Sequence, residues 1–463
     1  MRIGTGMVEI TPEEGIQLGG NVGCYRPAKI VSDPLYARTL VVESNGKKLC
    51  LITLDLVAIE RIYCDRIRKM VAEKWGFEYD AIMIHPLQIH SAPSLGNFML
   101  TEDIKNIPSE FDWLRGGDER YNSFAVDRII ESVKIASESL QDVKIGVGSG
   151  IEGRLAFNRR AVMRDGKVSM PGVWIPQNLP LGNTRICYIE GPMDPEVGVL
   201  CFRKDSLNIP VMLVSYTCHP VCVFAKNPCG CIVSADWPGA LADELRKRYG
   251  GNVLVLNGAC GNINPWNPFD PDYMKIDHRF IGRTLAEMVE KVIETMDFKE
   301  ETVIDWKVKH IKIPVRKVEP NLLDEAREIL KQNPDPVWIN EEKTRVDFKW
   351  FRALSIMNVY LLQQREPEFD YEIQVFRIGN VALVGLPGEM FVEGGLKIKL
   401  LSPAFKTYIV HMVNQYVGYI PTMDAFQRGG HEVDTTLWSK LVPEALDMIV
   451  DTSIKLLKEM FGK

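Results

Sequence analysis

The chain of 463 residues is 46% hydrophobic and 25% charged, which is typical of a globular protein and excludes a disordered one. Its formal net charge of −6 argues against a broad basic surface, so we expect a small-molecule partner and no nucleic acid. The first residues lack the features of a secretory signal, and no apolar run reaches the roughly 18 residues of a membrane span. These features predict a cytoplasmic protein whose ten cysteines are reduced thiols.

Buried strands are predicted at short apolar runs rich in β-branched residues, and stretches with helical spacing lie between them. The predicted strands span 49–54, 81–84, 211–216, 253–256, 381–385 and 408–413, and the predicted helices span 62–75, 124–140, 240–249, 281–296, 322–332 and 444–460. A further run, 372–378, is expected to form a hairpin with 381–385 through a turn at Gly379-Asn380. This alternation predicts an α/β fold with a mixed β-sheet core flanked by helices.

Two long stretches, 98–120 and 161–185, are rich in Pro, Gly, Trp and Met and show no regular period. Segments of this kind are either plain surface insertions or lids over a site. No internal repeat or linker occurs, and only the stretch 333–343 suggests a boundary. We therefore expect residues 1–463 to form a single catalytic domain.

Polar groups follow the predicted strands at the point where each strand ends. They are His85, Gln88 and His90 after 81–84, Cys218 and His219 after 211–216, Asn257 and Asn264 after 253–256, Glu389 after 381–385, and Asn414, Tyr416 and Tyr419 after 408–413. In open α/β sheets, ligands bind outside the carboxyl ends of the strands. The sequence therefore predicts a site where these five strand ends converge.

Several of these groups are of the types that bind zinc. Imidazoles together with a carboxylate suit a zinc ion with an open coordination position, and His431 in a Gly-rich loop adds a further imidazole. One alternative is that each histidine is separately a core or surface group. Another is a structural zinc site in 218–231, but the C-x3-C and C-x-C spacings there fit such a site poorly and better indicate small buried thiols.

Other catalytic signatures do not occur in the sequence. It contains no H-E-x-x-H, G-x-S-x-G, Walker or G-x-G-x-x-G motif. Their absence argues against a serine hydrolase and against proteins that bind nucleotide phosphates or dinucleotides.

A series of short motifs runs along the chain. They are Gly4-Thr5-Gly6-Met7-Val8-Glu9-Ile10-Thr11-Pro12 with Gly19-Gly20, Ile89-His90-Ser91-Ala92-Pro93, Phe157-Asn158-Arg159-Arg160, Cys218-His219-Pro220, Ser234-Ala235-Asp236, Gly261-Asn262-Ile263-Asn264-Pro265, Leu386-Pro387-Gly388-Glu389-Met390-Phe391 and Gly418-Tyr419-Ile420-Pro421-Thr422. In this order they resemble the motifs of the neutral, or non-lysosomal, ceramidases, which cleave amides with a zinc ion. The resemblance implies the catalytic fold of that family.

The resemblance also implies a set of zinc ligands. In the family these are the first histidine of a His-x-His pair, the histidine of a second motif, a glutamate and a tyrosine, and the matching positions here are Gln88, His219, Glu389 and Tyr419. Glutamine is a poor, neutral ligand for zinc. Three outcomes are open: His90 or His85 takes its place, the metal is different or more weakly bound, or the site is empty.

Two further positions depart from the family pattern. Asn264 stands where the family has a serine, and His431 lies where the family places a catalytic tyrosine. A histidine there could protonate or orient an oxyanion near neutral pH. We expect Arg159 and Asn264 to position the substrate or stabilise the oxyanion, with His431 and His90 as further catalytic residues.

The chain ends shortly after the last motif, so the C-terminal immunoglobulin-like domain of the ceramidases is expected to be absent. Together with the missing export signal, this predicts a small soluble amide or ester, such as a carbohydrate derivative, as the substrate of a metal-dependent hydrolase. One alternative is a metal-dependent isomerase or lyase acting on sugar acids, with His431 and His90 as acid and base. The other is a catalytically inactive binding protein.

Overall fold

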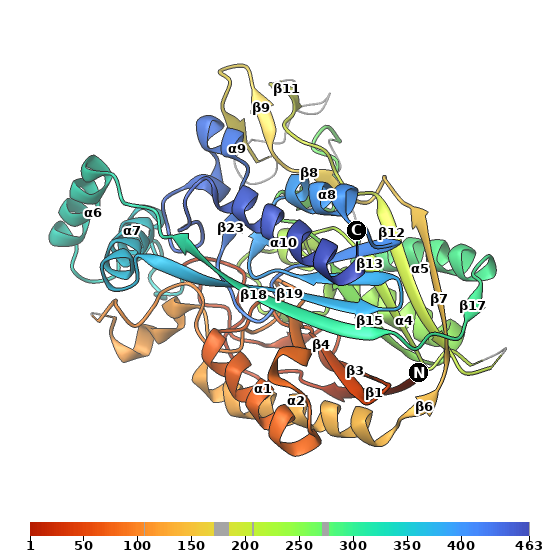
Figure 1. The fold of residues 1–463 in the computed structure, drawn as a ribbon. Coiled ribbons are helices and arrows are strands. Elements are labelled where there is room, and N and C mark those ends of the chain that lie inside the picture. Colours follow the sequence, from red (N-terminus) through yellow and green to blue (C-terminus); the bar gives the residue numbers. More distant parts are fainter. Residues whose placement is uncertain (106, 171–184, 206–207, 271–276, 463) are drawn as a thin grey trace.

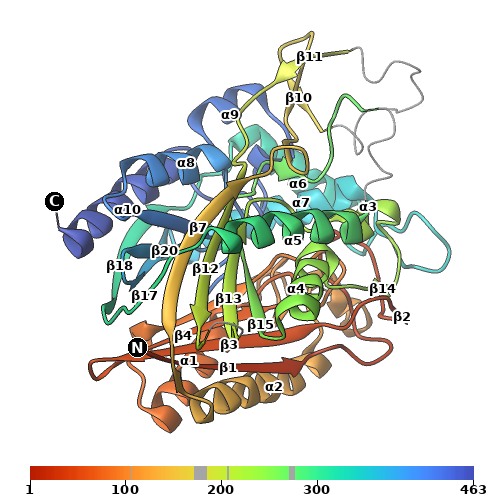
Figure 2. The ribbon, with the colours of Figure 1, turned by 90° about the vertical axis from the view of Figure 1, so that its right-hand side faces the viewer.

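Three β-sheets of four or five strands form the framework of the computed structural model, which describes residues 1–105, 107–170, 185–205, 208–270 and 277–462. Figure 1 shows helices on the outer faces of these sheets, and Figure 2 shows the same arrangement from the side. Within these residues, no helix is both long and apolar enough to cross a lipid bilayer.

The first sheet has the strand order β5-β4-β3-β1-β6. Its strands are β1 (Arg2–Glu9), β3 (Tyr36–Ser44), β4 (Lys47–Leu54), β5 (Ile82–Pro86) and β6 (Gln141–Asp142). β4 and β5 run parallel because α1 (Arg61–Trp75) crosses over between them, and the other neighbours are antiparallel. With α2 (Glu119–Glu138), α1 covers the outer face of this sheet, at the bottom of Figure 1.

The second sheet has the order β15-β13-β12-β7-β17, and the third has the order β18-β19-β20-β22. The second consists of β7 (Lys144–Ile151), β12 (Glu196–Arg203), β13 (Val211–Tyr216), β15 (Asn252–Asn257) and β17 (Phe298–Lys299), and α4 (Asp236–Tyr249) and α5 (His278–Glu294) pack on it. The third consists of β18 (Ile304–Pro314), β19 (Glu368–Ile378), β20 (Val381–Gly385) and β22 (Lys406–Val410), and α8 (Val392–Leu401) and α10 (Ala445–Phe461) pack on it. Each sheet contains one parallel pair, β13 with β15 in the second and β20 with β22 in the third.

The remaining elements are short or lie outside the sheets. They are β2 (Ile30–Val31), β8 (Phe157–Asn158), β9 (Ala161–Met163), β10 (Val168–Ser169), β11 (Ile186–Ile189), β14 (Ile232–Val233), β16 (Ile263–Asn264), β21 (Glu389–Met390), β23 (Tyr419–Ile420), α3 (Cys222–Lys226), α6 (Pro320–Gln332), α7 (Phe348–Arg365), α9 (Met423–Arg428) and the 3₁₀ helices Tyr79–Ala81, Ser109–Arg115 and His431–Val433. α6 and α7 pack against each other at the left of Figure 1.

The six predicted strands are mainly apolar, and side chains on both of their faces are buried. In β4, Leu49 and Leu51 enter a core shared by the three sheets, whereas Cys50 and Ile52 face the core beneath the helices. Successive side chains of a strand point to opposite faces, so a sheet covered on both sides needs an unbroken apolar run. The predicted α/β fold with a mixed-sheet core is confirmed.

The six predicted strands and the hairpin are present, although some boundaries differ. Gly379 adopts a left-handed φ of 60° in the turn between β19 and β20, as the hairpin requires. The predicted strand 408–413 stops at Val410, because Met412 and Asn414 have φ values of 56° and 62° and turn the chain. The predicted strands did not include β1, β3, β7, β12 and β18. Glycines obscure the apolar pattern of β1 and β7, and β18 carries many charged residues. Gly4 of β1 is needed for packing, since a Cβ there would lie 1.9 Å from the Ala136 carbonyl oxygen of α2.

The predicted loop 98–120 packs into the protein. Phe98, Met99, Leu100 and Leu114 are buried in the core of the third sheet, so the segment is not a plain surface insertion. Phe98 and Met99 also line a cavity at the candidate site described below. Of the second predicted loop, 161–185, the structure describes β9 and β10, and 171–184 lie outside the described residues.

Candidate active site

Asn257, at the end of β15, joins the strand ends around the site. Its backbone N–H donates to His85 Nε2 (3.1 Å), and its side-chain amide donates to the Leu87 carbonyl oxygen (3.2 Å). Its side-chain oxygen accepts from the Cys218 N–H (3.3 Å), and its carbonyl oxygen accepts from the His411 N–H (3.1 Å). The segments that follow β5, β13, β15 and β22 therefore meet, as the sequence predicted.

His219 and Glu389 form the centre of the site. His219 Nδ1–H donates to the carbonyl oxygens of Cys260 (2.6 Å) and Ile263 (3.1 Å), which leaves the lone pair of the neutral ring on Nε2. Nε2 lies 3.4 Å from Glu389 Oε2, and neither atom has a hydrogen-bond partner within the described part of the chain. Burial lowers the pKa of His219. Two electron-pair acceptors thus face each other, and a shared cation or proton would stabilise them.

The backbone holds Glu389 and Tyr419 side by side. They are partners in the parallel pair of β21 and β23, and the Glu389 N–H donates to the Gly418 carbonyl oxygen at 2.8 Å. The residue before each is a glycine with positive φ, 79° at Gly388 and 91° at Gly418. A Cβ at Gly388 would lie 2.5 Å from the Gly418 carbonyl oxygen, so the two segments approach this closely only because residue 388 is a glycine. A Cβ at Gly418 would instead meet the Trp438 backbone.

Tyr416 is one of the polar groups predicted to converge on the site, and its contact with Glu389 was not indicated by the sequence. Its hydroxyl group donates to Glu389 Oε1 at 3.1 Å, and its backbone N–H donates to the Ile59 carbonyl oxygen. Burial and the charge of Glu389 raise the pKa of Tyr416 well above its usual value, so the hydroxyl stays a donor. Its position after a predicted strand and three residues before Tyr419 was the signal in the sequence.

His90 is held against the glycine-rich segment near the N-terminus. Its Nδ1–H donates to the Gly20 carbonyl oxygen at 2.9 Å, which leaves Nε2 as an acceptor. Gly20 has a φ of 83°, and a Cβ there would lie 2.8 Å from His90 Cα. Buried Arg26 donates to the carbonyl oxygens of Gly19 and His90 and so fixes this contact. The His90 ring centre lies 5.7 Å from that of His219.

Gln88 and His85 occupy different surroundings. Gln88 lines the same cavity as His90 and Glu389, but its side-chain oxygen accepts from Cys260 Sγ–H at 3.6 Å. His85 lies behind the cavity, with its ring centre 5.9 Å from that of His411, and burial lowers its pKa to about 3. Of the two histidines considered as substitutes for a ligand at Gln88, His90 lines the cavity.

Arg159 and Asn264 lie together beside Tyr419. The Arg159 guanidinium donates to Glu432 Oε1 (2.8 Å) and Asn264 Oδ1 (3.4 Å), and its carbon lies 5.4 Å from the centre of the Tyr419 ring. Burial alone would raise the pKa of Glu432, but Arg159 and Arg160 lower it to about 2. Arg159 Nη2 is buried and finds no acceptor among the residues that the structure describes. It is therefore a buried donor without an acceptor, next to the Tyr419 ring.

His431 separates two cavities. Its ring contacts the Tyr419 ring (5.5 Å between centres) and stacks on Trp438 (5.6 Å). Burial lowers its pKa, so the ring is neutral at neutral pH. On one side is a cavity of about 60 Å³ that Glu389 and Tyr416 also line. On the other is a cavity of about 610 Å³, whose polar walls include Arg159, Arg160, Arg352, Glu432 and Asp434.

The donor set is incomplete as a metal site. Among the described residues, no group of three or more His, Cys, Asp and Glu side chains is arranged to hold a metal ion. The predicted cluster is thus only partly assembled: His219 adjoins Glu389, Tyr419 lies beside Glu389, and His90 is further away. The two unpartnered atoms, His219 Nε2 and Glu389 Oε2, are of the types that zinc binds, so the residues present fit a divalent cation.

Lys440 carries a buried amino group behind Tyr416. Its Nζ donates to the carbonyl oxygens of Val417 (2.5 Å) and Leu437 (3.3 Å) and lies 5.9 Å from the centre of the Tyr416 ring. Burial lowers its pKa from 10.5 to about 7. Between those two pH values the unfolded chain binds more protons at this residue than the folded protein does, so its contribution to the free energy of unfolding rises with pH.

Replacing Lys440 with methionine should remove this pH dependence. We expect the difference in unfolding free energy between wild type and Lys440→Met to increase by roughly 1.4 kcal/mol per pH unit above pH 7. Urea unfolding at several pH values measures it, and Lys397→Met, at an exposed lysine, is the control. A difference that stays constant with pH would contradict the prediction.

No family model matches the chain. The neutral ceramidase of Pseudomonas aeruginosa is 20% identical over 512 residues, which cover 98% of this chain and 72% of that protein. The crystal structure of neutral ceramidase from Pseudomonas aeruginosa superposes with a TM-score of 0.70 at 18% identity, covering 99% of this chain and 74% of that one. A ceramidase complexed with C2 gives a TM-score of 0.66 at 16% identity, over 99% and 75% of the two chains. The resemblance to the neutral ceramidases is thus confirmed along almost the whole chain, which shares their fold.

Proposed function

We propose that the chain is a metal-dependent hydrolase that cleaves an amide or ester in a small soluble substrate, such as a carbohydrate derivative. The observation that carries the proposal is the pair of buried, unpartnered acceptors, His219 Nε2 and Glu389 Oε2, 3.4 Å apart. A buried acceptor without a partner is costly, and two that face each other are a common feature of a cation site. The similarity to neutral ceramidases supports a hydrolase.

A zinc ion would be held by His219 and Glu389 with Tyr419 and His90, whereas the oxygen of Gln88 is engaged by Cys260. When bound, zinc would supply Lewis acidity toward a carbonyl oxygen and lower the pKa of water. Tyr416 would orient Glu389 through its hydrogen bond. The carboxylate supplies the negative charge that a divalent cation needs, since the imidazoles are neutral.

The remaining residues would act on the substrate directly. Arg159 Nη2 would donate to the oxygen that gains negative charge, and a preorganised donor of this kind contributes roughly 2.7–4 kcal/mol in other hydrolases. Asn264 holds the Arg159 guanidinium from one side and Glu432 from the other. His431, neutral and next to Tyr419, would transfer a proton to or from the leaving group.

A polar substrate suits the larger cavity. Its volume of about 610 Å³ is in the range of small-molecule sites. Its walls carry the ion pairs of Arg160 with Glu432 (2.7 Å) and Arg352 with Asp434 (2.6 Å). A hydrocarbon chain next to these charged groups would gain little binding free energy, because it would displace the water that hydrates them. Hydroxyl groups could form hydrogen bonds with them.

The function is tested by metal content and product analysis on the same preparation. We expect purified protein, loaded with zinc after chelation, to release a free amine and an acid from N-acyl sugars faster than from ceramide. A primary-amine reagent and chromatography of the acid measure the two products. Conversion of sugar acids with neither product would favour the isomerase or lyase, and protein that binds no metal and converts nothing would favour the binding protein.

A further inference from the structure

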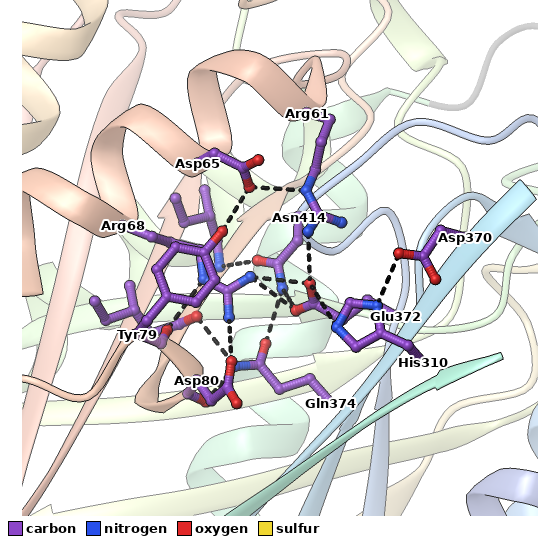
Figure 3. A network of polar contacts seen from close by, with 12 residues as sticks. Arg61, Asp65, Arg68, Tyr79, Asp80, His310, Asp370, Glu372, Gln374 and Asn414 are labelled. Atoms are coloured by element: carbon purple, nitrogen blue, oxygen red, sulfur yellow. Dashed lines mark hydrogen bonds and ion pairs between the residues drawn. The ribbon is translucent and has the colours of Figure 1, made fainter.

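A buried network behind the site converges on Asn414. Figure 3 shows Asn414 among the side chains of Arg68, Glu372 and Gln374. Its backbone N–H donates to the Ile84 carbonyl oxygen at 2.9 Å, and its side-chain oxygen accepts from the Ile84 N–H at 2.9 Å. Asn414 thus satisfies both backbone groups of Ile84 as a neighbouring strand would.

The side-chain amide of Asn414 points the other way, to the third sheet. It donates to Glu372 Oε1 (2.8 Å) and Gln374 Oε1 (2.9 Å), alternate residues of β19 that share one face. Asparagine suits the position, because it offers two donors and an acceptor and tolerates the left-handed φ of 62°. One side chain therefore joins β5 of the first sheet to β19 of the third.

Arg68 fixes the anion of this network. Its guanidinium donates to both Glu372 oxygens (2.8 and 3.1 Å) and to the Tyr79 carbonyl oxygen (3.1 Å). Both side chains of the pair are almost fully buried, with exposures of 0% and 1%. The acceptor that holds Asn414 is therefore itself held by α1.

Asn414 belongs to the segment 411–419, which carries groups of the candidate site. Tyr416 follows it by two residues and donates to Glu389, and Tyr419 pairs with Glu389 through the backbone. Met412 and Asn414 are both left-handed, so the chain turns sharply here. The direction from which Tyr416 reaches Glu389 depends on where this turn is fixed.

We propose that Asn414 is a positioning residue of the candidate site, which sets the orientation of Glu389 toward His219 by fixing Tyr416. This proposal rests on the proposed function, because metal affinity and turnover are two of the quantities that test it. A purely structural role would lower stability and leave both quantities unchanged in the folded protein. A positioning role acts through Tyr416, so the effects of changing the two residues should not multiply.

A double-mutant cycle tests this. Asn414→Gly keeps the left-handed backbone and removes the side-chain hydrogen bonds, and Tyr416→Phe removes the hydroxyl group. We expect each variant to weaken zinc binding, measured by competition with a chromophoric chelator, and to lower kcat at saturating zinc by about tenfold, with KM within about twofold. The double variant should be no more than about twofold worse than the worse single variant. Effects that multiply, or an Asn414→Gly variant with wild-type affinity and kcat, would overturn the proposal.

Two further variants serve as controls for this experiment. Asn45→Gly, at another left-handed asparagine (φ 49°) in the exposed turn between β3 and β4, should change neither quantity. If Asn414→Gly does not fold, Gln374→Leu, which removes one of the two acceptors of the Asn414 amide, should shift zinc affinity and kcat in the same direction by about threefold. Unchanged values in Gln374→Leu would then overturn the proposal.

A readout without metal separates this proposal from the proposed function. In zinc-free protein, Asn414→Gly should speed hydrogen–deuterium exchange of segment 411–419 by at least about tenfold, while α10 exchanges as in the wild type. A wild type that binds no zinc and shows no turnover, together with this local change, would refute the proposed function and support the positioning of the segment. Exchange that is unchanged in 411–419, or accelerated equally throughout the protein, would refute the positioning.

Discussion

Replacing Glu389 with glutamine is expected to remove zinc and turnover together while the protein still folds. Glu389 is the one carboxylate of the proposed set, whereas the imidazoles are neutral and burial raises the pKa of Tyr419 well above its usual value. An amide has nearly the same shape and carries no charge. Elemental analysis for zinc, amine release from an N-acyl sugar and thermal unfolding, each on both proteins, measure the outcome.

The metal-free proteins provide a sharper comparison. Glutamine can donate an N–H to His219 Nε2, the lone pair that faces Glu389 in the wild type, so the metal-free variant should be at least as stable as the metal-free wild type. Zinc should raise the unfolding temperature of the wild type only. Glu131→Gln, at an exposed glutamate paired with Arg128, is the matched control and should behave as the wild type. Equal zinc content in Glu389→Gln and wild type would remove Glu389 from the site.

A role of Glu389 in capping a helix is not supported by its contacts. α8 begins at Val392 with Phe391 as its N-cap residue, and the Asn262 side-chain oxygen accepts from the Val392 N–H at 2.9 Å. The carboxylate of Glu389 instead lies between Tyr416 and His219. Glu389 therefore does not cap α8, and a loss of zinc in Glu389→Gln would not be explained by a frayed helix.

Replacing Glu372 with glutamine is expected to lower the free energy of unfolding by about 3–5 kcal/mol, because it leaves the Arg68 guanidinium buried without its anion. Asp80 lies 3.6 Å from Arg68 but is half exposed, and it compensates only in part. Glutamine keeps an oxygen that can accept from Asn414. Urea unfolding monitored by far-UV circular dichroism measures the loss.

The partner residue supplies the control for this prediction. In the double variant Arg68→Met/Glu372→Gln the unpaired charge is gone, so part of the lost stability should return. Glu131→Gln, which breaks an exposed ion pair, should cost no more than about 1 kcal/mol. A double variant less stable than Glu372→Gln alone would show that Arg68 stabilises the fold by packing rather than by its charge.

The sequence alone predicted strands whose side chains are buried on both faces. Strands such as 211–216 and 381–385 match β13 and β20 to the residue, because both faces of their sheets are covered and the runs are apolar throughout. The same pattern located the candidate site, since His219 and Glu389 directly follow these strands. Gly388 and Gly418 stand in the motifs that contain the site residues. The sequence does not show, however, that each allows a close approach of backbone segments.

Only the tertiary structure decided which polar groups meet. Tyr416, Asn414 and Asn257 follow predicted strands, but the sequence does not indicate their partners. Each forms a hydrogen bond with a residue more than 20 positions away in the chain. Gln88 was predicted at a ligand position, but Cys260 engages its side-chain oxygen in a contact between different strand ends. Apolar periodicity indicates which face of a strand is buried. It carries no information on how three sheets are oriented around a shared core. The partners of these buried polar groups are therefore determined by the packing of the sheets alone.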